Sequence, residues 1–210
     1  AHNNIGIILQ NMGKLKEAEL SLHKAIELKP DFSNAHSNLG STFRELGNLK
    51  KAELSLRKAI NLNPNFVEAH MNLGKVLRDI GKLNEAEISA RKATELNPDS
   101  PDGFIFLGSL LKDIGKLNEA KEYLLKAIEL NPNLVEAHYI LAWIALHEGS
   151  NILSMKYFII TAELLRGSKI QEPNNIRFKI ISQAKIRHDI EQFEYLAAQD
   201  YERKKFNSLA

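Results

Sequence analysis

The histidines are the residues of this chain that could most readily do chemistry, because imidazole is a common metal ligand. Four of the seven, His2, His36, His70 and His138, occupy one position of a 34-residue period. Equivalent residues in successive repeats lie about 10 Å apart, one layer of helix packing each, whereas a metal–nitrogen bond is about 2 Å long. The series cannot share one metal ion, so we interpret these histidines as packing residues.

Other signatures of catalytic or metal sites are incomplete. His147-Glu148 lacks the rest of an H-E-x-x-H zinc motif, and Gly115-Lys116 lacks the rest of a phosphate-binding loop. The chain has no cysteine, which excludes disulfides, thiolate catalysis and cysteine-ligated zinc or iron–sulfur sites. Its acidic residues are dispersed along helix faces and are not paired across a cleft. The sequence therefore predicts a protein that is not an enzyme and that carries no metal or other cofactor.

Composition narrows the class of partner. The 28 Lys and Arg residues against 26 Asp and Glu leave a net charge of +2, which gives little reason to expect binding to nucleic acid or to an acidic membrane. No stretch approaches the roughly 20 apolar residues of a membrane helix, and the first residues do not form a signal peptide. No N-x-[ST] sequon occurs either. We expect a cytoplasmic protein.

A 34-residue repeat organises the chain. The segment KLKEAELSLHKAIELKPDF (14–32) recurs at 48–66, 82–100 and 116–134. Such self-similarity is typical of solenoid proteins. We divide the sequence into five units, the last degenerate, and a non-repeating helical extension: 1–32, 33–66, 67–100, 101–134, 135–168 and 169–210.

Each unit predicts two antiparallel helices. In the second unit, apolar residues recur at helical spacing on both sides of Gly47, a glycine suited to the left-handed backbone that follows a helix. Pro64 ends the second helix. Gly40 and Ala52 are small enough to let two helix axes approach within about 8–10 Å. One pair cannot bury its own apolar stripes, so the units must stack into an all-α solenoid closed by C-terminal capping helices.

These positions resemble the tetratricopeptide repeat family, whose signature combines a large residue, Leu-Gly, an aromatic residue, two alanines and a late proline. The second unit fills it with His36, Leu39, Gly40, Phe43, Ala52, Leu56, Ala59 and Pro64. The fifth unit departs from it at Ser154, Thr161 and Arg166. The array looks most like those of O-linked N-acetylglucosamine transferases and of bacterial, including cyanobacterial, repeat proteins. The resemblance implies a right-handed superhelix that serves as a protein–protein interaction scaffold.

In this family the first helix of each pair lines a concave groove that binds an extended peptide or a partner helix. The resemblance places seven polar residues of this chain in that groove: Asn4, Asn38, Asn72, Arg44, Lys75, Arg78 and Lys112. The asparagines resemble the ladder with which the transferase-type arrays hold a peptide backbone, since a side-chain amide both donates and accepts. The cations favour a somewhat acidic peptide. The alternative is a solvated surface whose cations pair with nearby acids.

A second branch of the family clamps the carboxylate end of chaperone tails. Asn3, Ser37 and Met71 stand where that branch has its first lysine, so we do not expect such a clamp.

Towards the fifth unit the predicted groove becomes apolar. Its residues are Phe106, Tyr139, Ile140, Trp143 and Leu146. Exposed together, they would promote association. We expect the extension 169–210 to cover part of this patch, as a cap on the last helix pair or by insertion into the groove. A homo-oligomer formed through this end is the alternative.

Two functions remain open. The chain could be a stand-alone binding scaffold, or the substrate-recruiting arm of a larger enzyme of the glycosyltransferase or oxygenase type. Ala1 falls inside the first predicted helix and Ala210 follows a charged helix with no evident end, so we expect a piece of something longer. A stop codon soon after 210 would favour the scaffold, and a further domain would favour the enzyme arm.

Overall fold

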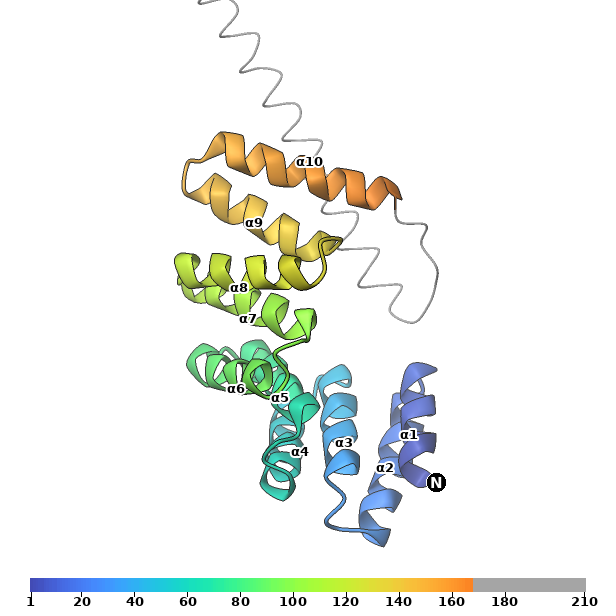
Figure 1. Ribbon diagram of the computed structural model, residues 1–210. Coiled ribbons are helices and arrows are strands. Elements are labelled where there is room, and N and C mark those ends of the chain that lie inside the picture. The colour runs from blue at the N-terminus through green and yellow to red at the C-terminus, as the bar shows by residue number, and fades with distance from the viewer. Residues whose placement is uncertain (168–210) are drawn as a thin grey trace, which may run out of the picture. The chain divides into compact units, whose positions relative to one another are not determined.

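A computed structural model of the chain describes residues 1–167 (Figure 1). This range is helical throughout and contains no strand. Its helices are α1 (His2–Asn11), α2 (Leu15–Leu28), α3 (Ser33–Glu45), α4 (Leu49–Leu62), α5 (Val67–Ile80), α6 (Leu83–Leu96), α7 (Pro101–Ile114), α8 (Leu117–Leu130), α9 (Val135–His147) and α10 (Asn151–Gly167). The predictions for the extension 169–210 lie outside the described residues.

The helices form consecutive pairs, as the repeat predicts. α1 packs on α2, α3 on α4, α5 on α6, α7 on α8 and α9 on α10. The turn inside each pair carries a glycine with positive φ, for example 76° at Gly47 and 88° at Gly81. An L-residue with a side chain is strained in this left-handed region, which is why a glycine follows the first helix.

Ala1–Leu130 forms one compact unit of stacked pairs. α2 packs on α3, α4 on α5 and α6 on α7, so each pair buries its apolar stripe against the next. The first helices also meet directly, α1 with α3 and α3 with α5. This arrangement confirms the all-α solenoid of antiparallel helix pairs.

Small residues allow the two helices of a pair to touch. A Cβ atom added to Gly40 of α3 would lie 2.5 Å from Cγ of Leu56 and 3.2 Å from the carbonyl oxygen of Ala52, both on α4. Those distances are below van der Waals contact, so glycine is required there. Leu56 and Ala52 are fully buried, and the same approach recurs between Gly108 and Leu124.

The third pair departs from this pattern. At the position of Leu56 it has Ala90, which is completely buried. Its helix glycine, Gly74, instead faces Phe106 of α7, whose Cε1 would lie 2.9 Å from an added Cβ atom. The aromatic ring of the fourth pair thus occupies the space that a leucine fills in the first, second and fourth pairs.

A second compact unit begins at Asn131 and contains α9 and α10. Its core is built around Ala142 and Phe158, with Tyr139 packed against them. Ser154 and Thr161, which depart from the repeat signature, are fully buried. Their hydroxyl groups donate to the carbonyl oxygens of Ala142, at 3.0 Å, and Tyr157, at 2.8 Å, so the polar replacements are hydrogen-bonded inside the hairpin.

Within residues 1–167, no helix combines the length and the apolar character that crossing a membrane would require.

Candidate functional site

The histidine series holds the turns between pairs. Nε2 of His36 donates to the carbonyl oxygen of Pro30 at 2.9 Å, and Nε2 of His70 donates to that of Pro64 at 2.8 Å. His138 repeats the contact with Pro132 in the second compact unit. Each bond ties the start of a first helix to the chain that leaves the preceding pair. Among the described residues, no group of His, Cys, Asp and Glu side chains is arranged to hold a metal ion.

The predicted polar site lies on α1, α3, α5 and α7. Its seven residues are Asn4, Asn38, Asn72, Arg44, Lys75, Arg78 and Lys112, and together with Asn3 of α1 we call them the first-helix face. All of these residues belong to the compact unit Ala1–Leu130. The cations Arg44, Lys75, Arg78 and Lys112 are half-buried along the face.

Three asparagines form a chain of side-chain amides. Nδ2 of Asn38 donates to Oδ1 of Asn3 at 2.9 Å, and Nδ2 of Asn3 lies 3.4 Å from Oδ1 of Asn4. Asn3 is buried, Asn38 and Asn72 are half-buried, and Asn4 is exposed. Among residues 1–167, no hydrogen bond is made by the side chain of Asn72 or accepted by Oδ1 of Asn38. These amide groups are therefore positioned on the face with hydrogen-bonding capacity to spare.

Side chains at the ends of the first helices form a ladder between repeats. Nε2 of Gln10 donates to Glu45 at 2.7 Å, and Nε of Arg44 donates to Asp79 at 2.6 Å, in each case across 35 residues.

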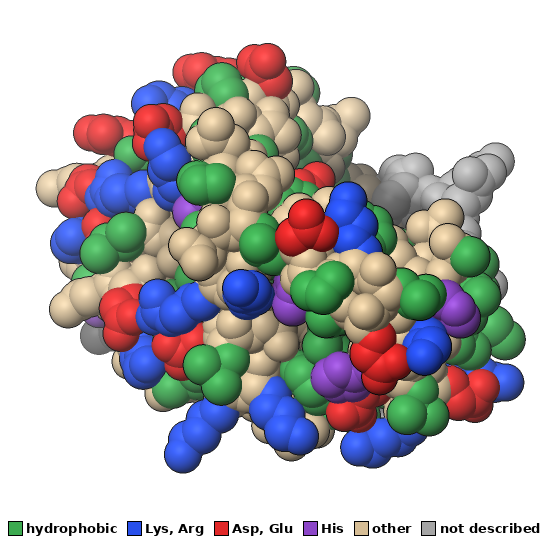
Figure 2. All heavy atoms as spheres, turned by 90° about the horizontal axis from the view of Figure 1, so that it is seen from below, with side chains coloured by type: hydrophobic (Ala, Val, Ile, Leu, Met, Phe, Trp, Pro, Cys, Tyr) green, Lys and Arg blue, Asp and Glu red, His purple; other side chains and the backbone are tan. Residues whose placement is uncertain are grey.

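The next rung of the ladder joins Arg78 to Asp113, and Nζ of Lys112 lies 3.2 Å from the same carboxylate group. These cations are paired, which corresponds to the alternative interpretation of the sequence. Figure 2 shows one face of the molecule, on which Lys and Arg side chains likewise lie among Asp and Glu side chains.

The predicted apolar residues divide into buried and exposed ones. Phe106 and Ile140 are only 9% and 5% exposed, so neither side chain lies open on the surface. Phe106 fills the space above Gly74, and Tyr139 packs edge-on against Phe158 with ring centroids 6.1 Å apart. Trp143 and Leu146 of α9 are exposed, at 46% and 39%.

Sequence reasoning missed a cluster of charges on the second helices. Glu53 of α4 accepts from Arg57 at 2.9 Å and from Lys82 at 3.0 Å, and Arg57 also reaches Glu85 of α6 at 2.5 Å. Burial alone would raise the pKa of Glu53, but the hydrogen bonds from Lys82 and Arg57 outweigh it and lower that pKa.

The same cluster recurs one repeat later. Glu87 accepts from Arg91 and Lys116, and Arg91 reaches Glu119 of α8 at 2.5 Å. Burial opposes the shift here too, yet the two hydrogen bonds lower the pKa of Glu87. The 34-residue recurrence of all four charges is the signal that could have revealed the clusters. They join successive repeats and offer no catalytic pair.

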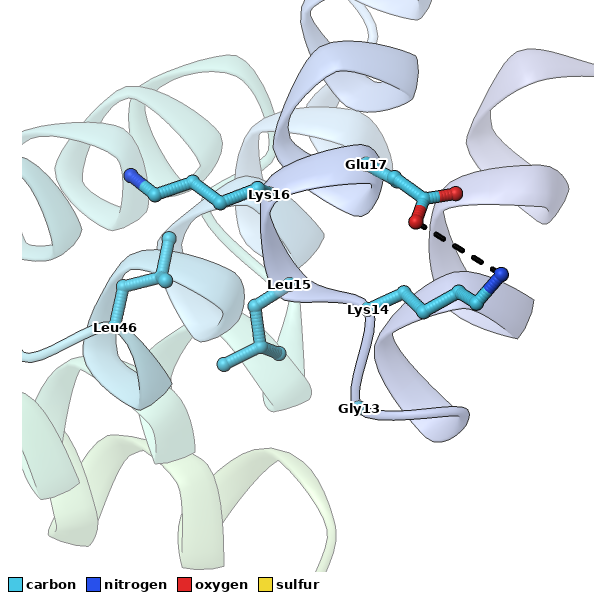
Figure 3. A pocket seen from close by; sticks show the side chains of 6 residues that line it. All are labelled: Gly13, Lys14, Leu15, Lys16, Glu17 and Leu46. Atoms are coloured by element: carbon cyan, nitrogen blue, oxygen red, sulfur yellow. Dashed lines mark ion pairs between the residues drawn. The ribbon is translucent and has the colours of Figure 1, made fainter.

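A hollow of about 350 Å³ lies at the turn between α1 and α2, beside Leu46, which follows α3 (Figure 3). Nζ of Lys14 is 3.8 Å from Oε1 of Glu17, and Lys16 points away from this pair. One long ion pair beside Leu15 and Leu46 is not a catalytic arrangement.

Comparison with models of protein families identifies the family of this chain. Models described as "Tetratricopeptide repeat" match residues 1–32, 67–100 and 102–134, and one described as "TPR repeat" matches 40–81. The chain belongs to the tetratricopeptide repeat family. This assignment agrees with the helix pairs, the turn glycines and the close helix contacts described above.

Solved tetratricopeptide repeat structures share the fold. MamA is 24% identical, covers 77% of this chain and 95% of its own, and has a TM-score of 0.71. YrrB, described as a TPR protein with an unusual peptide-binding site, is 20% identical over 79% of this chain and 86% of its own, with a TM-score of 0.67. PilF of Pseudomonas aeruginosa is 22% identical over 100% of this chain and 96% of its own, with a TM-score of 0.74. No curated protein matches the chain.

Proposed function

We propose that this tetratricopeptide repeat protein is a non-catalytic interaction module that binds an extended peptide on its first-helix face. The family assignment and the description of YrrB as a protein with a peptide-binding site support a peptide ligand. The observation that carries the proposal is the pair of half-buried amides, Asn38 and Asn72, which occupy one position on neighbouring first helices.

Side-chain amides suit the backbone of a peptide. Each amide can accept from an N–H group and donate to a carbonyl oxygen, whatever the side chains of the ligand. Equivalent positions in neighbouring repeats are roughly 10 Å apart, and an extended chain advances about 3.3 Å per residue. Asn38 and Asn72 would therefore contact peptide units about three residues apart.

The ion-pair ladder bears on the sequence preference of this site. Arg44 and Arg78 already pair with Asp79 and Asp113, so an acidic ligand would have to compete with those carboxylates. We therefore propose that recognition of the peptide backbone dominates and that a preference for acidic side chains is secondary. Binding that rests on amides also depends little on salt concentration, since salt screens charges.

The test is capture of peptides from a proteolysed lysate by the full chain, with identification by mass spectrometry. The Asn38→Ala/Asn72→Ala variant should lose most of the captured set while its circular dichroism stays unchanged. Asn84→Ala on α6, an exposed asparagine away from the face, is the matched control and should retain the set. Equal capture by the wild type and the double variant would contradict the proposal.

A further inference from the structure

A separate surface is marked by one large aliphatic side chain on each of three second helices. Leu20 on α2, Leu54 on α4 and Ile88 on α6 share one repeat position and are 71%, 70% and 70% exposed. In α8 the equivalent residue is Glu122. One exposed leucine is ordinary, but three in series place apolar side chains on three neighbouring helices. We call these three residues the aliphatic row.

The helices that carry the aliphatic row are neighbours. The ring centroid of Phe43 on α3 lies 6.2 Å from that of His23 on α2. Nζ of Lys51 on α4 lies 5.4 Å from the centroid of the same Phe43 ring. Arg57 of α4 pairs with Glu85 of α6. α2 and α4 thus both contact Phe43 of α3, and α4 reaches α6 through an ion pair, so the row crosses the second helices of three successive repeats.

An open hollow of about 620 Å³ adjoins Ile88. The apolar side chains that line it are Ile60, Leu73 and Ile88, with Arg57, Arg91 and Lys92 among the charged ones. Leu73 belongs to α5 and is buried, so it forms part of the floor between α4 and α6. The hollow has room for an aliphatic or aromatic side chain inserted from outside.

The charge of α4 indicates what kind of partner fits. This helix carries Lys50, Lys51, Arg57 and Lys58 against one acid, Glu53, whereas α2, α6 and α8 each carry two basic and three acidic residues. Lys50 and Lys58 are exposed, and within residues 1–167 neither lies within 4 Å of a carboxylate oxygen. An acidic partner would supply the missing counter-charges on both sides of Leu54.

The spacing of the row favours a helix as the ligand. Its members are roughly 10 Å apart, one repeat each. Residues i and i+7 of an α-helix lie on one face and about 10 Å apart, because the rise is 1.5 Å per residue. In an extended strand, residues on one face are about 6.6 or 13 Å apart, so a step of roughly 10 Å suits a helix better.

We propose that the aliphatic row, the adjoining hollow and the basic surface of α4 dock an acidic amphipathic α-helix of a partner protein. The partner helix would place an apolar side chain at every seventh residue over Leu20, Leu54 and Ile88, and its carboxylates beside Lys50 and Lys58. This site lies on the second helices and is separate from the first-helix face.

The probe is a designed 21-residue helix, labelled with fluorescein, that has leucine at three positions seven residues apart and glutamate around them. Fluorescence anisotropy with the full chain measures its affinity. The matched control peptide has lysine in place of glutamate. We expect the glutamate peptide to bind at least tenfold more tightly than the lysine peptide.

Protein variants locate the binding. Leu54→Ser/Ile88→Ser should weaken binding by about tenfold or more, since two aliphatic contacts are lost. Leu28→Ser, which changes an equally exposed leucine of α2 outside the row, should leave the affinity unchanged. Asn38→Ala/Asn72→Ala should also leave it unchanged, so that failure of this site and failure of the first-helix face can be told apart. Circular dichroism checks that each variant is folded.

Three outcomes would overturn the proposal: no binding of the glutamate peptide, equal binding of the two peptides, or undiminished binding by Leu54→Ser/Ile88→Ser. Sedimentation tests two other ligands that the aliphatic row could bind, a lipid vesicle and a second copy of this chain. If the row instead mediates binding to phosphatidylserine vesicles or to a second copy of this chain, that activity would be lost in Leu54→Ser/Ile88→Ser, and the glutamate peptide would not bind.

Discussion

Ala90 and Phe106 should behave as a compensating pair. Phe106 occupies the place above Gly74 that Leu56 occupies above Gly40. It can do so because Ala90, at the repeat position of Leu56, is too small to fill that place. The test combines Ala90→Leu, which restores the leucine of the other pairs, with Phe106→Asn, which restores the asparagine found at the same position in the first three units.

The expected losses in the free energy of unfolding follow from the burial of the two side chains. Phe106 is 9% exposed, so its removal should cost about 3 kcal/mol, near the lower end for a large aromatic residue because the asparagine amide can reach solvent. Ala90→Leu alone forces extra carbon atoms into occupied space and should cost about 1–3 kcal/mol. In the double variant the new leucine fills the vacated volume. We therefore expect a loss of only about 1 kcal/mol and a coupling free energy of about 3–5 kcal/mol, which is the sum of the two single losses less the loss in the double variant.

The assay is urea unfolding of the wild type, both single variants and the double variant, followed by far-ultraviolet circular dichroism. Solenoids can unfold in parts, so two-state behaviour must be checked with a second probe. The fluorescence of Trp143, the one tryptophan of the chain, serves this purpose because it reports on α9.

Additive losses, with a coupling free energy below about 0.5 kcal/mol, would refute the compensation. A confirmed compensation would have a functional consequence as well. The double variant would extend the series Asn4, Asn38, Asn72 by one amide at 106, and peptide affinity at the first-helix face should rise.

Three further predictions concern contacts between and within repeats. Gly40→Ala should lower the free energy of unfolding by about 1–2 kcal/mol in urea titrations, because the new methyl group collides with Leu56; unchanged stability would show that α3 and α4 separate freely. Stability measured against pH should be constant above about 4.5 and fall as the pH drops through the lowered folded-state pKa values of Glu53 and Glu87, and replacing both by glutamine should flatten that fall; an undiminished fall in the glutamine variant would contradict it. Arg78→Gln should cost less than about 1 kcal/mol, a difference that should vanish in 1 M salt, as for other partly exposed ion pairs; a loss that persists in salt would assign that residue a packing role.

The sequence predicts the helix pairs because their determinants are local and repeated. Gly47 and Pro64, like their equivalents in other units, mark the ends of helices. The contact between Gly40 and Leu56 inside a pair also recurs in other units. Each signal appears several times in phase, so a chance match at one position does not mislead.

The candidate site was less predictable because it depends on how one repeat is rotated against the next. The acids beside Arg44 and Arg78 are visible in the sequence, but only the stacking geometry shows that each arginine reaches the acid 35 residues ahead. The packing of Phe106 against Gly74 was hard to predict for a related reason. Its burial follows from Ala90 in the preceding pair, and a residue-by-residue comparison with the family pattern does not link the two.

The most direct test of the first-helix face is nuclear magnetic resonance of the side-chain amides. A peptide captured by the wild type would be titrated into the full chain labelled with ¹⁵N. We predict that the Nδ2 signals of Asn38 and Asn72 shift together and saturate at one dissociation constant. If saturating peptide left both signals unmoved while other signals shifted, the peptide would bind elsewhere, and the assignment of the first-helix face as the binding site would be wrong.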